Sequence, residues 1–224
     1  MRPEISVVMP IYNGQMYLKE AIESILSQTF SDFEFIIIND GSTDRSEEVV
    51  KSYKDERIVY LDNGRNLGLS KSFNVGIKTA RGTYIARMDA DDVADPRRFE
   101  KQLAYFKAHP KISILGTAVI TTDETGRAGK IIRKPKEHWL IKWQSLLSIP
   151  LFHPTVMTRA ETLKQNPFDE NLHNSEDYEL WSRLLFTTPA KFANLKEGLL
   201  KYRAFPQSFT QNLKTEKREA SAIN

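Results

Sequence analysis

Apolar residues in the first half of the chain alternate between short continuous runs and segments with helical spacing. Continuous runs are typical of strands buried on both faces of a parallel sheet, whereas apolar side chains three and four positions apart are typical of amphipathic helices. We predict strands at 5–9, 35–38, 58–61 and 84–88, and helices at 17–26, 44–53, 69–80 and 95–106. Repeated strand–helix units of this length predict an α/β protein with a doubly wound, mostly parallel, Rossmann-like sheet.

Two of these helices begin with a capping signal. Asp44 is followed three residues later by Glu47, which is the pattern of a capping box. Asp95 is followed by Pro96, which combines a capping residue with proline in the first turn. We therefore predict that Asp44 caps its helix rather than contacting a ligand.

The pattern changes after about residue 110. We predict strands at 112–122 and 130–133 joined by a turn-rich segment, a helix around 139–147, a strand at 155–157, a helix at 177–185, and strands at 191–195 and 199–205. Trp139 and Trp143 lie four residues apart and so share one helical face. We expect them to pack in the core, with a sugar-stacking surface, together with Trp181, as the alternative.

No Gly/Ser-rich or proline-rich linker separates the two halves, so we predict one domain over residues 1–224. With 40% hydrophobic and 27% charged residues, the composition is that of an ordinary soluble globular protein. The absence of cysteine excludes disulfides and thiolate metal sites and favours a reducing, cytoplasmic environment. No apolar stretch approaches the ~20 residues that span a bilayer, and the short apolar run at the N-terminus does not resemble a secretion signal.

The net charge of +3 is too small to indicate nucleic-acid binding. Basic residues are nevertheless concentrated towards the end of the chain, at Lys191, Lys196, Lys201, Arg203, Lys214, Lys217 and Arg218. Such a segment can hold a protein at the periphery of an anionic membrane surface. The simpler interpretation is a solvated, charged end.

Polar residues follow three of the predicted strands, at 10–14, 39–42 and 89–92. In open parallel sheets, ligands bind beyond the carboxyl ends of the strands, so we expect these segments to lie along one rim. Turn-forming residues are common at strand ends, but an ordinary turn explains one such segment more readily than all three.

The third segment is the most acidic, with Asp89, Asp91, Asp92 and Asp95 within seven positions. Like charges packed this closely repel one another, so either a cation holds them together or they face water. The chain has no glycine-rich dinucleotide or P-loop motif that could hold phosphate. Asp89 and Asp91 offer the hard oxygen ligands with which Mg²⁺ or Mn²⁺ bridges a protein and a diphosphate, and we predict such a site.

Two long segments carry a family resemblance, SVVMPIYNGQMYLKEAIESILSQTFSDFEFIIINDGSTD and NLGLSKSFNVGIKTARGTYIARMDADD. They resemble the donor-binding half of family 2 glycosyltransferases, inverting enzymes of the GT-A fold. Weaker similarity continues through HPTVMTR and SEDYELWSRLL, so the resemblance covers nearly all of residues 4–186. It implies a nucleotide-sugar-binding half at 1–110, an acceptor-binding half at 111–210 and a polar tail at 211–224.

On the donor side, the resemblance implies that Pro10 and Tyr12 line the base pocket, with the Tyr12 ring stacked on the base. The simpler role for Tyr12 is packing on the next helix. Asp40 is implied to accept a hydrogen bond from N3–H of the base, which favours uracil over cytosine. Asp91 is implied to be the first metal ligand, and Asp89 to contact the ribose or the metal.

On the acceptor side, the resemblance implies that Asp177 is the base that takes the acceptor hydroxyl proton. Glu176 is implied to orient the acceptor, and Asp92 to orient the acceptor or bind the backbone. The alternative is that Glu176 and Asp177 merely form an acidic first turn favoured by the helix dipole. His153 is a candidate metal ligand or diphosphate contact, or else a satisfied histidine before a proline turn.

These observations predict a metal-dependent, inverting hexosyl- or N-acetylhexosaminyltransferase that uses Mn²⁺ or Mg²⁺. Its donor is expected to be a nucleotide sugar, with UDP favoured, and its acceptor a saccharide or lipid-linked saccharide, as in capsule, exopolysaccharide or lipopolysaccharide assembly. A sugar nucleotidyltransferase and a non-catalytic nucleotide-sugar-binding module are the alternatives. The former has no need of the base that Asp177 provides.

Overall fold

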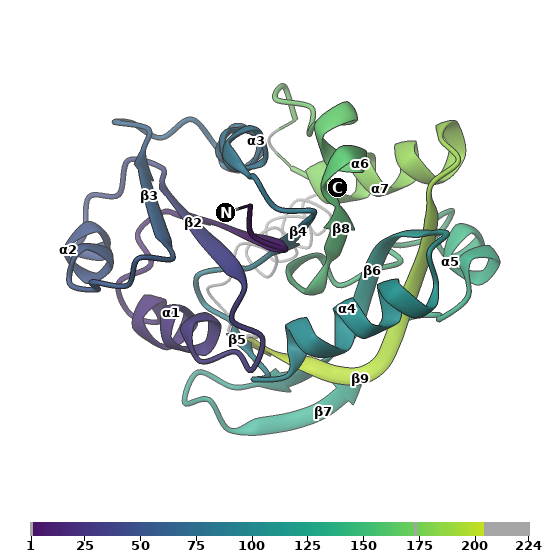
Figure 1. Ribbon diagram of the computed structural model, residues 1–224, viewed down its shortest axis with the longest axis horizontal. Coiled ribbons are helices and arrows are strands. Elements are labelled where there is room, and N and C mark those ends of the chain that lie inside the picture. The colour runs from purple at the N-terminus through teal and green to yellow at the C-terminus, as the bar shows by residue number, and fades with distance from the viewer. Residues whose placement is uncertain (1, 173, 204–224) are drawn as a thin grey trace, which may run out of the picture.

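All the strands of the part of the chain described by the computed structural model, residues 2–172 and 174–203, belong to one curled sheet (Figure 1). Its strand order is β3-β2-β1-β4-β8-β6-β9-β5, with β7 paired to β6. The strands are β1 (Ile5–Ile11), β2 (Phe33–Asn39), β3 (Ile58–Asp62), β4 (Tyr84–Arg87), β5 (Val93–Ala94), β6 (Ile112–Thr122), β7 (Ala128–Ile132), β8 (Met157–Arg159) and β9 (Lys191–Arg203).

Helices cover both faces of this sheet. They are α1 (Leu18–Leu26), α2 (Ser46–Lys51), α3 (Leu69–Thr79), α4 (Arg98–Ala108), α5 (His138–Gln144), α6 (Ala160–Gln165) and α7 (Glu176–Thr187), with a short 3₁₀ helix, η1 (His153–Thr155). Side chains of β1 alternate between two cores: Val7 and Met9 pack with α1 and α4, whereas Val8 packs with α3 and the helices of the second half. Burial on both faces explains the continuous apolar runs.

The first half agrees closely with the sequence pattern. Strand β1 pairs in parallel with β2 and with β4, and β2 pairs in parallel with β3. Every predicted helix of this half is present. The capping box predicted at α2 does not form, because the residue that precedes the helix is Arg45, which makes no side-chain capping bond. Asp44 accepts the N–H of Ser46 at 2.9 Å, but Glu47 pairs with Lys51 instead of reaching back to the start of the helix.

The second half departs from the prediction in three places. The strand predicted at 155–157 is η1 followed by β8, because Pro154 lies in the 3₁₀ turn. The two strands predicted at 191–195 and 199–205 form a single strand over their described part, β9, whose pairing with β6 shifts between Leu195 and Gly198. A Cβ at Gly198 would lie 2.7 Å from Ile120, so this glycine serves close strand packing rather than a turn. The pattern also missed α6 in this half, as it missed the two-residue β5 in the first half.

The prediction that Trp139 and Trp143 pack in the core is wrong. Their side chains are 61% and 68% exposed, whereas Ile141 is fully buried on the opposite side of α5. The third tryptophan, Trp181, is 1% exposed and lies in the core. A four-residue spacing establishes that two side chains share a helical face, but it does not determine which way that face points.

The interpretation of the basic C-terminal segment as a solvated end holds for Lys191, Lys196 and Lys201, which are exposed, but is wrong for Arg203, which is 5% exposed. Its guanidinium donates hydrogen bonds to several separate segments of the chain. The remaining basic residues of that segment, at 214, 217 and 218, lie outside the described residues. Within those residues, no helix has the length and hydrophobicity of a membrane span.

Candidate active site

The exits of β1 and β2 are joined by hydrogen bonds. The N–H of Asp40 donates to the carbonyl of Ile11 at 2.8 Å. Asn13 donates its N–H to Ser42 Oγ at 3.1 Å and accepts the N–H of Thr43 at 2.8 Å. A Cβ at Gly14, in the same segment, would lie 3.5 Å from Ala90 Cβ in the loop after β4. The predicted convergence of the three strand exits on one rim is confirmed.

The residues implied to hold the base lie on this rim. Pro10 is buried within β1, whereas Tyr12 is 52% exposed just beyond it. The next residue, Asn13, adopts a φ of 51°, a left-handed conformation that is uncommon for a residue other than glycine. An exposed aromatic ring on a rigidly bonded turn is suited to stacking on a flat ligand.

Asp40 organises the neighbouring loop. One of its carboxylate oxygens accepts from Asn63 Nδ2 at 2.8 Å and from the N–H of Leu67 at 2.9 Å, and the other accepts from the N–H of Gly68 at 3.0 Å. The side chain is 3% exposed. Asp40 therefore holds the segment before α3 in place, and any hydrogen bond to a base would be additional to this role.

The loop after β4 brings three carboxylates together. Each of Asp89, Asp91 and Asp92 offers an oxygen, and these oxygens all lie within 4.8 Å of one another. Asp92 Oδ2 is buried and has no hydrogen-bond partner among the described residues. Three hard oxygen donors, one of them lacking a partner, fit a small divalent cation such as Mg²⁺ or Mn²⁺.

Arg87, the last residue of β4, is the cation nearest to this cluster in sequence. Its guanidinium binds both oxygens of Asp89, at 3.0 and 3.3 Å, and lies 4.5 Å from the centre of the Phe73 ring. The side chain is only 9% exposed. Since an arginine that binds both oxygens of a carboxylate fixes its orientation, Asp89 is held at the rim before any ligand arrives.

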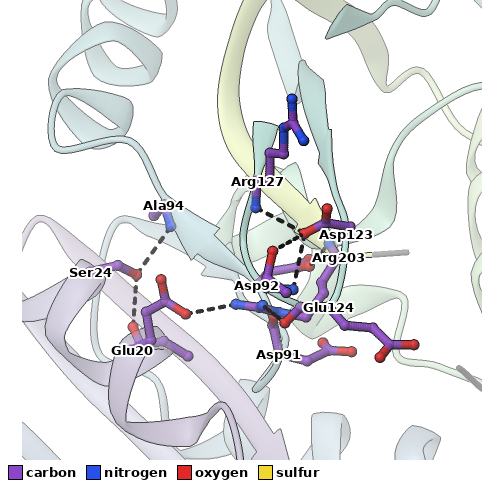
Figure 2. Close-up of polar contacts among 11 residues, drawn as sticks. Glu20, Ser24, Asp91, Asp92, Ala94, Asp123, Glu124, Arg127 and Arg203 are labelled. Atoms are coloured by element: carbon purple, nitrogen blue, oxygen red, sulfur yellow. Dashed lines mark hydrogen bonds and ion pairs between the residues drawn. The ribbon is translucent and has the colours of Figure 1, made fainter. Parts of the chain in front are cut away.

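Arg203 also binds two aspartates of this cluster (Figure 2). Its backbone N–H donates to Asp92 Oδ1 and its Nε to the carbonyl of Asp91, both at 3.0 Å. Other nitrogens of the guanidinium donate to Glu20 on α1 at 2.6 Å and to the carbonyl of Glu124 at 3.0 Å. One arginine thus joins α1, the aspartate loop and the turn between β6 and β7. The backbone contact predicted for Asp92 is confirmed.

The acids of the loop are strongly perturbed. Burial, reinforced by the charge of Asp89, raises the pKa of Asp91 to about 6. Burial also raises the pKa of Asp92, with further contributions from the two neighbouring aspartates. A third arginine, Arg98, donates to the carbonyl of Arg87 at 2.8 Å from a fully buried position. Three arginines therefore surround three aspartates, yet the carboxylate–carboxylate repulsion persists.

The first turn of α7 provides a second acidic pair. Ser175, just before this helix, has a φ of 63°. Among the described residues other than glycine, Asn13 and Ser175 have a left-handed φ, and each lies next to predicted site residues. Burial is the main cause that raises the pKa of Glu176 and of Asp177. The charge of Arg87 opposes this rise at both carboxyls. The acidic end of α7 and the aspartate loop therefore share the field of one arginine.

His153 lies apart from the converging acids. Its ring is 7% exposed and packs edge-on against Trp181, with ring centres 5.4 Å apart, and close to Phe73 and Phe168. Burial, with a smaller effect of Arg87, holds the pKa of His153 well below its usual value. Neither ring nitrogen has a hydrogen-bond partner among the described residues, so it is not the satisfied histidine of the simpler interpretation. It is not among the three described residues that converge as potential metal ligands.

The sequence prediction missed the three arginines. For Arg87 and Arg98 a signal existed: Arg87 interrupts an apolar strand, and Arg98 is adjacent to Phe99 on the buried side of α4. A buried arginine requires a partner, and the nearest candidates were the aspartates. For Arg203 the sequence offered no such signal, because its partners lie 79 to 183 positions away.

Comparison with known proteins agrees with this geometry. The family model described as Glycosyl transferase family 2 matches residues 6–163. The chain is 42% identical over 207 residues to an uncharacterized glycosyltransferase of Methanocaldococcus jannaschii, covering 90% of this chain and 71% of that protein. It is 35% identical over 211 residues to the O-antigen biosynthesis glycosyltransferase WbnJ of Escherichia coli, covering 91% of this chain and 81% of that one.

The chain belongs to glycosyl transferase family 2. Among solved structures, that of S. aureus TarS residues 1–349 in complex with UDP is similar, with a TM-score of 0.73 and 23% identity. The match covers 92% of this chain and 62% of the TarS chain, so this chain spans less than two thirds of that protein. The predicted family and the mixed α/β GT-A fold are confirmed, and the sugar nucleotidyltransferase alternative gains no support.

Proposed function

We propose that this glycosyltransferase is metal-dependent and inverting, and that it moves a hexosyl or N-acetylhexosaminyl group from a UDP-sugar to a hydroxyl of a saccharide or lipid-linked saccharide. The observation that carries the proposal is the convergence of Asp89, Asp91 and Asp92, with Asp92 Oδ2 lacking a partner. The relative named for O-antigen biosynthesis supports a polysaccharide setting, and the UDP-bound TarS supports the choice of donor.

On the donor side, Tyr12 stacks on the base and Asp40 accepts a hydrogen bond from it, beside Pro10. Asp91 and Asp89 hold the cation, with Asp92 as an additional oxygen donor. When bound, Mn²⁺ or Mg²⁺ neutralises the diphosphate as it leaves. His153 makes at most an indirect contribution through Arg87, since it lies outside the acid cluster.

On the acceptor side, Asp177 takes the proton of the attacking hydroxyl as the new bond forms, on the face of the sugar opposite the diphosphate. Burial raises its pKa and so strengthens it as a base, and the charge of Arg87 opposes that rise. Glu176, adjacent in the first turn of α7, orients the acceptor. A membrane-bound acceptor would require the protein to act at the inner face of a membrane.

The proposal is tested by calorimetry with Mn²⁺ and UDP, combined with turnover of a panel of UDP-sugars. Asp91→Asn should abolish the metal-dependent heat of UDP binding. Asp177→Asn should retain that heat and lower turnover by about 10² to 10⁴-fold, the usual contribution of a general base. Asp169→Asn, an exposed aspartate outside the site, is the matched control and should change neither quantity.

Two results would contradict the proposal. UDP binding that is indifferent to both Mn²⁺ and Asp91→Asn would exclude the metal site. Metal-dependent binding without hydrolysis or transfer of any UDP-sugar would instead indicate a non-catalytic binding module.

A further inference from the structure

An exposed apolar stripe runs along α5 and the turn that follows it. Trp139, Trp143, Leu146 and Leu147 are 61%, 68%, 56% and 90% exposed. The turn continues the helical path, because Leu147 donates its N–H to the carbonyl of Gln144 at 2.9 Å. The opposite side of the same segment holds the buried Ile141 and is sufficient to anchor α5 to the core. The outer stripe therefore has no role in the packing of the described chain.

The stripe extends onto the neighbouring helix. Phe186, near the end of α7, is 49% exposed, and Lys142 of α5 lies over its ring, with Nζ 4.7 Å from the ring centre. In Figure 1, α5 lies at the right-hand edge of the molecule, outside β6 and β9. We call these five apolar residues and Lys142 the α5 patch.

The surroundings of the α5 patch are basic. Between residues 133 and 147, four side chains are basic (Arg133, Lys134, Lys136 and Lys142) and one, Glu137, is acidic. Lys134 is partly buried and donates to the carbonyl of Ile149 at 2.7 Å, so Arg133, Lys136 and Lys142 supply the outward charge. Lys191 of β9 also lies nearby, since it and Lys142 both contribute to lowering the pKa of His138, after burial. Two tryptophans and two leucines rimmed by lysine and arginine are the composition of a surface that enters the headgroup region of an anionic bilayer.

The same charges disfavour other occupants. A second copy of the chain docked through the same patch in a two-fold dimer would bring the basic rims of the two copies together. Residues 204–224 contain three basic and two acidic side chains and so offer no complementary negative surface. An anionic partner complements the rim, and exposed tryptophan and leucine side chains are suited to the interface of a bilayer.

The α5 patch adjoins the proposed acceptor site. The hydroxyl of Tyr178 donates to the carbonyl of Ser145 at 2.7 Å, which ties the end of α5 to the first turn of α7. Glu176 and Asp177 are the two residues directly before this tyrosine. Leu146 and Leu147, which directly follow Ser145, are therefore close to the turn of α7 that carries the candidate base.

We propose that the α5 patch docks the protein on an anionic lipid bilayer and so presents a lipid-linked acceptor to α7. The presentation of the acceptor rests on the proposed function, whereas the membrane contact itself does not. The sequence alone suggested a membrane contact through the basic residues near the end of the chain. The present proposal places that contact on α5 instead.

The test uses the full chain with vesicles of phosphatidylcholine containing phosphatidylglycerol, compared with phosphatidylcholine alone. Cosedimentation should require the anionic lipid and should weaken as salt rises. Because Trp181 is buried, bromine-labelled lipid should quench only the fluorescence of Trp139 and Trp143. Trp143→Gln and Leu147→Gln should each lower the partition coefficient about tenfold, as expected for loss of one buried apolar side chain.

The matched control is Ile131→Gln, which changes an apolar residue of β7 that is 46% exposed away from α5, and it should partition as the unmodified chain does. Asp177→Asn should lose sugar transfer but bind vesicles normally. This variant therefore separates a failure of the proposed function from a failure of the proposed membrane contact. Absence of quenching, or equal losses in Leu147→Gln and Ile131→Gln, overturns the proposal. A dimer that Leu147→Gln dissociates, with no vesicle binding, overturns it in favour of a second copy.

Discussion

The two halves of the sheet are built in different ways. Residues of β1 and β2 are all buried, and the strands β1 to β4 pair in parallel, so their carboxyl ends meet at one rim. In the second half, β6 runs parallel to β9 but antiparallel to β7 and β8, and β7 is exposed along its whole length. The candidate site residues of this half come from the start of a helix, α7, and from the end of a long strand, β9.

This difference explains where sequence patterns succeed. In a parallel sheet the position of a polar residue just after a strand also defines its position in space. In a mixed sheet with long strands and irregular pairing, the same residue type can lie at either edge. Arg203 illustrates this, because it joins the two halves at the aspartate loop although it lies more than a hundred residues beyond that loop in the sequence.

The largest effect on stability is expected from breaking this junction. Arg203→Met removes the donors to Glu20 and to the carbonyls of Asp91 and Glu124. Buried acceptors left without partners cost about 1 to 3 kcal/mol each, and because Glu20 is half exposed we expect a total loss of about 2 to 4 kcal/mol. Urea denaturation measures it. Lys201→Met, an exposed lysine on the same strand, should change stability by less than about 0.5 kcal/mol.

The next effect concerns the charge shared by both halves. Arg87→Gln removes the cation that lowers the pKa of Asp177, so that pKa should rise and the acidic limb of the pH–rate profile should move to higher pH. We expect turnover near neutral pH to fall ten- to a hundredfold, about 1.4 to 2.7 kcal/mol. Arg87→Lys keeps the charge and should leave the limb in place. A loss of turnover with an unchanged limb in Arg87→Gln would indicate a purely structural role.

The free energy of unfolding should depend on pH through the carboxylates of the aspartate loop. The pKa of Asp91 is about 6 in the folded chain against 3.8 for the free side chain. The folded state therefore binds the proton more tightly, so stability contributed by the protonated form is present below pH 4 and is lost as the pH rises to about 6. We expect a loss of about 1 to 3 kcal/mol without metal.

Thermal unfolding between pH 4 and pH 7 checks this expectation. Asp91→Asn should reduce the dependence without abolishing it, because Asp92, Glu176 and Asp177 also have raised pKa values. Asp169→Asn should leave it unchanged. Mn²⁺ should stabilise the unmodified chain more at pH 7 than at pH 5, because the metal competes with the proton for the same oxygens. Equal stabilisation at both values would contradict the assignment of Asp91 as a ligand.

The smallest effect is expected at the contact between α5 and α7. Tyr178→Phe removes one hydrogen bond, to the carbonyl of Ser145, and should cost about 1 kcal/mol in the free energy of unfolding. Hydrogen exchange should increase at the end of α5 while the first half remains protected. Protection that falls equally in both halves would show that α5 and α7 do not form a separable unit.

Much of the candidate site was predictable from the sequence, but its electrostatics were not. The aspartate loop, the Tyr12 rim and the acidic start of α7 were found because each follows or begins a regular element. The orientation of Trp139 and Trp143 was not predictable, because an amphipathic pattern with apolar residues on both sides fits burial of either face. The roles of Arg87, Arg98 and Arg203 were also missed, since a charged side chain reveals its burial only through its partners.

The sequence by itself determined the α/β architecture of the first half, the family and the acids at the strand ends, because local periodicity and short motifs encode them directly. Only the tertiary structure decided that three arginines surround three aspartates, that β9 returns to close the site, and that α5 presents tryptophan to solvent. These features depend on contacts between residues far apart in the chain. Such contacts are fixed by packing and charge pairing in three dimensions, which no local pattern records.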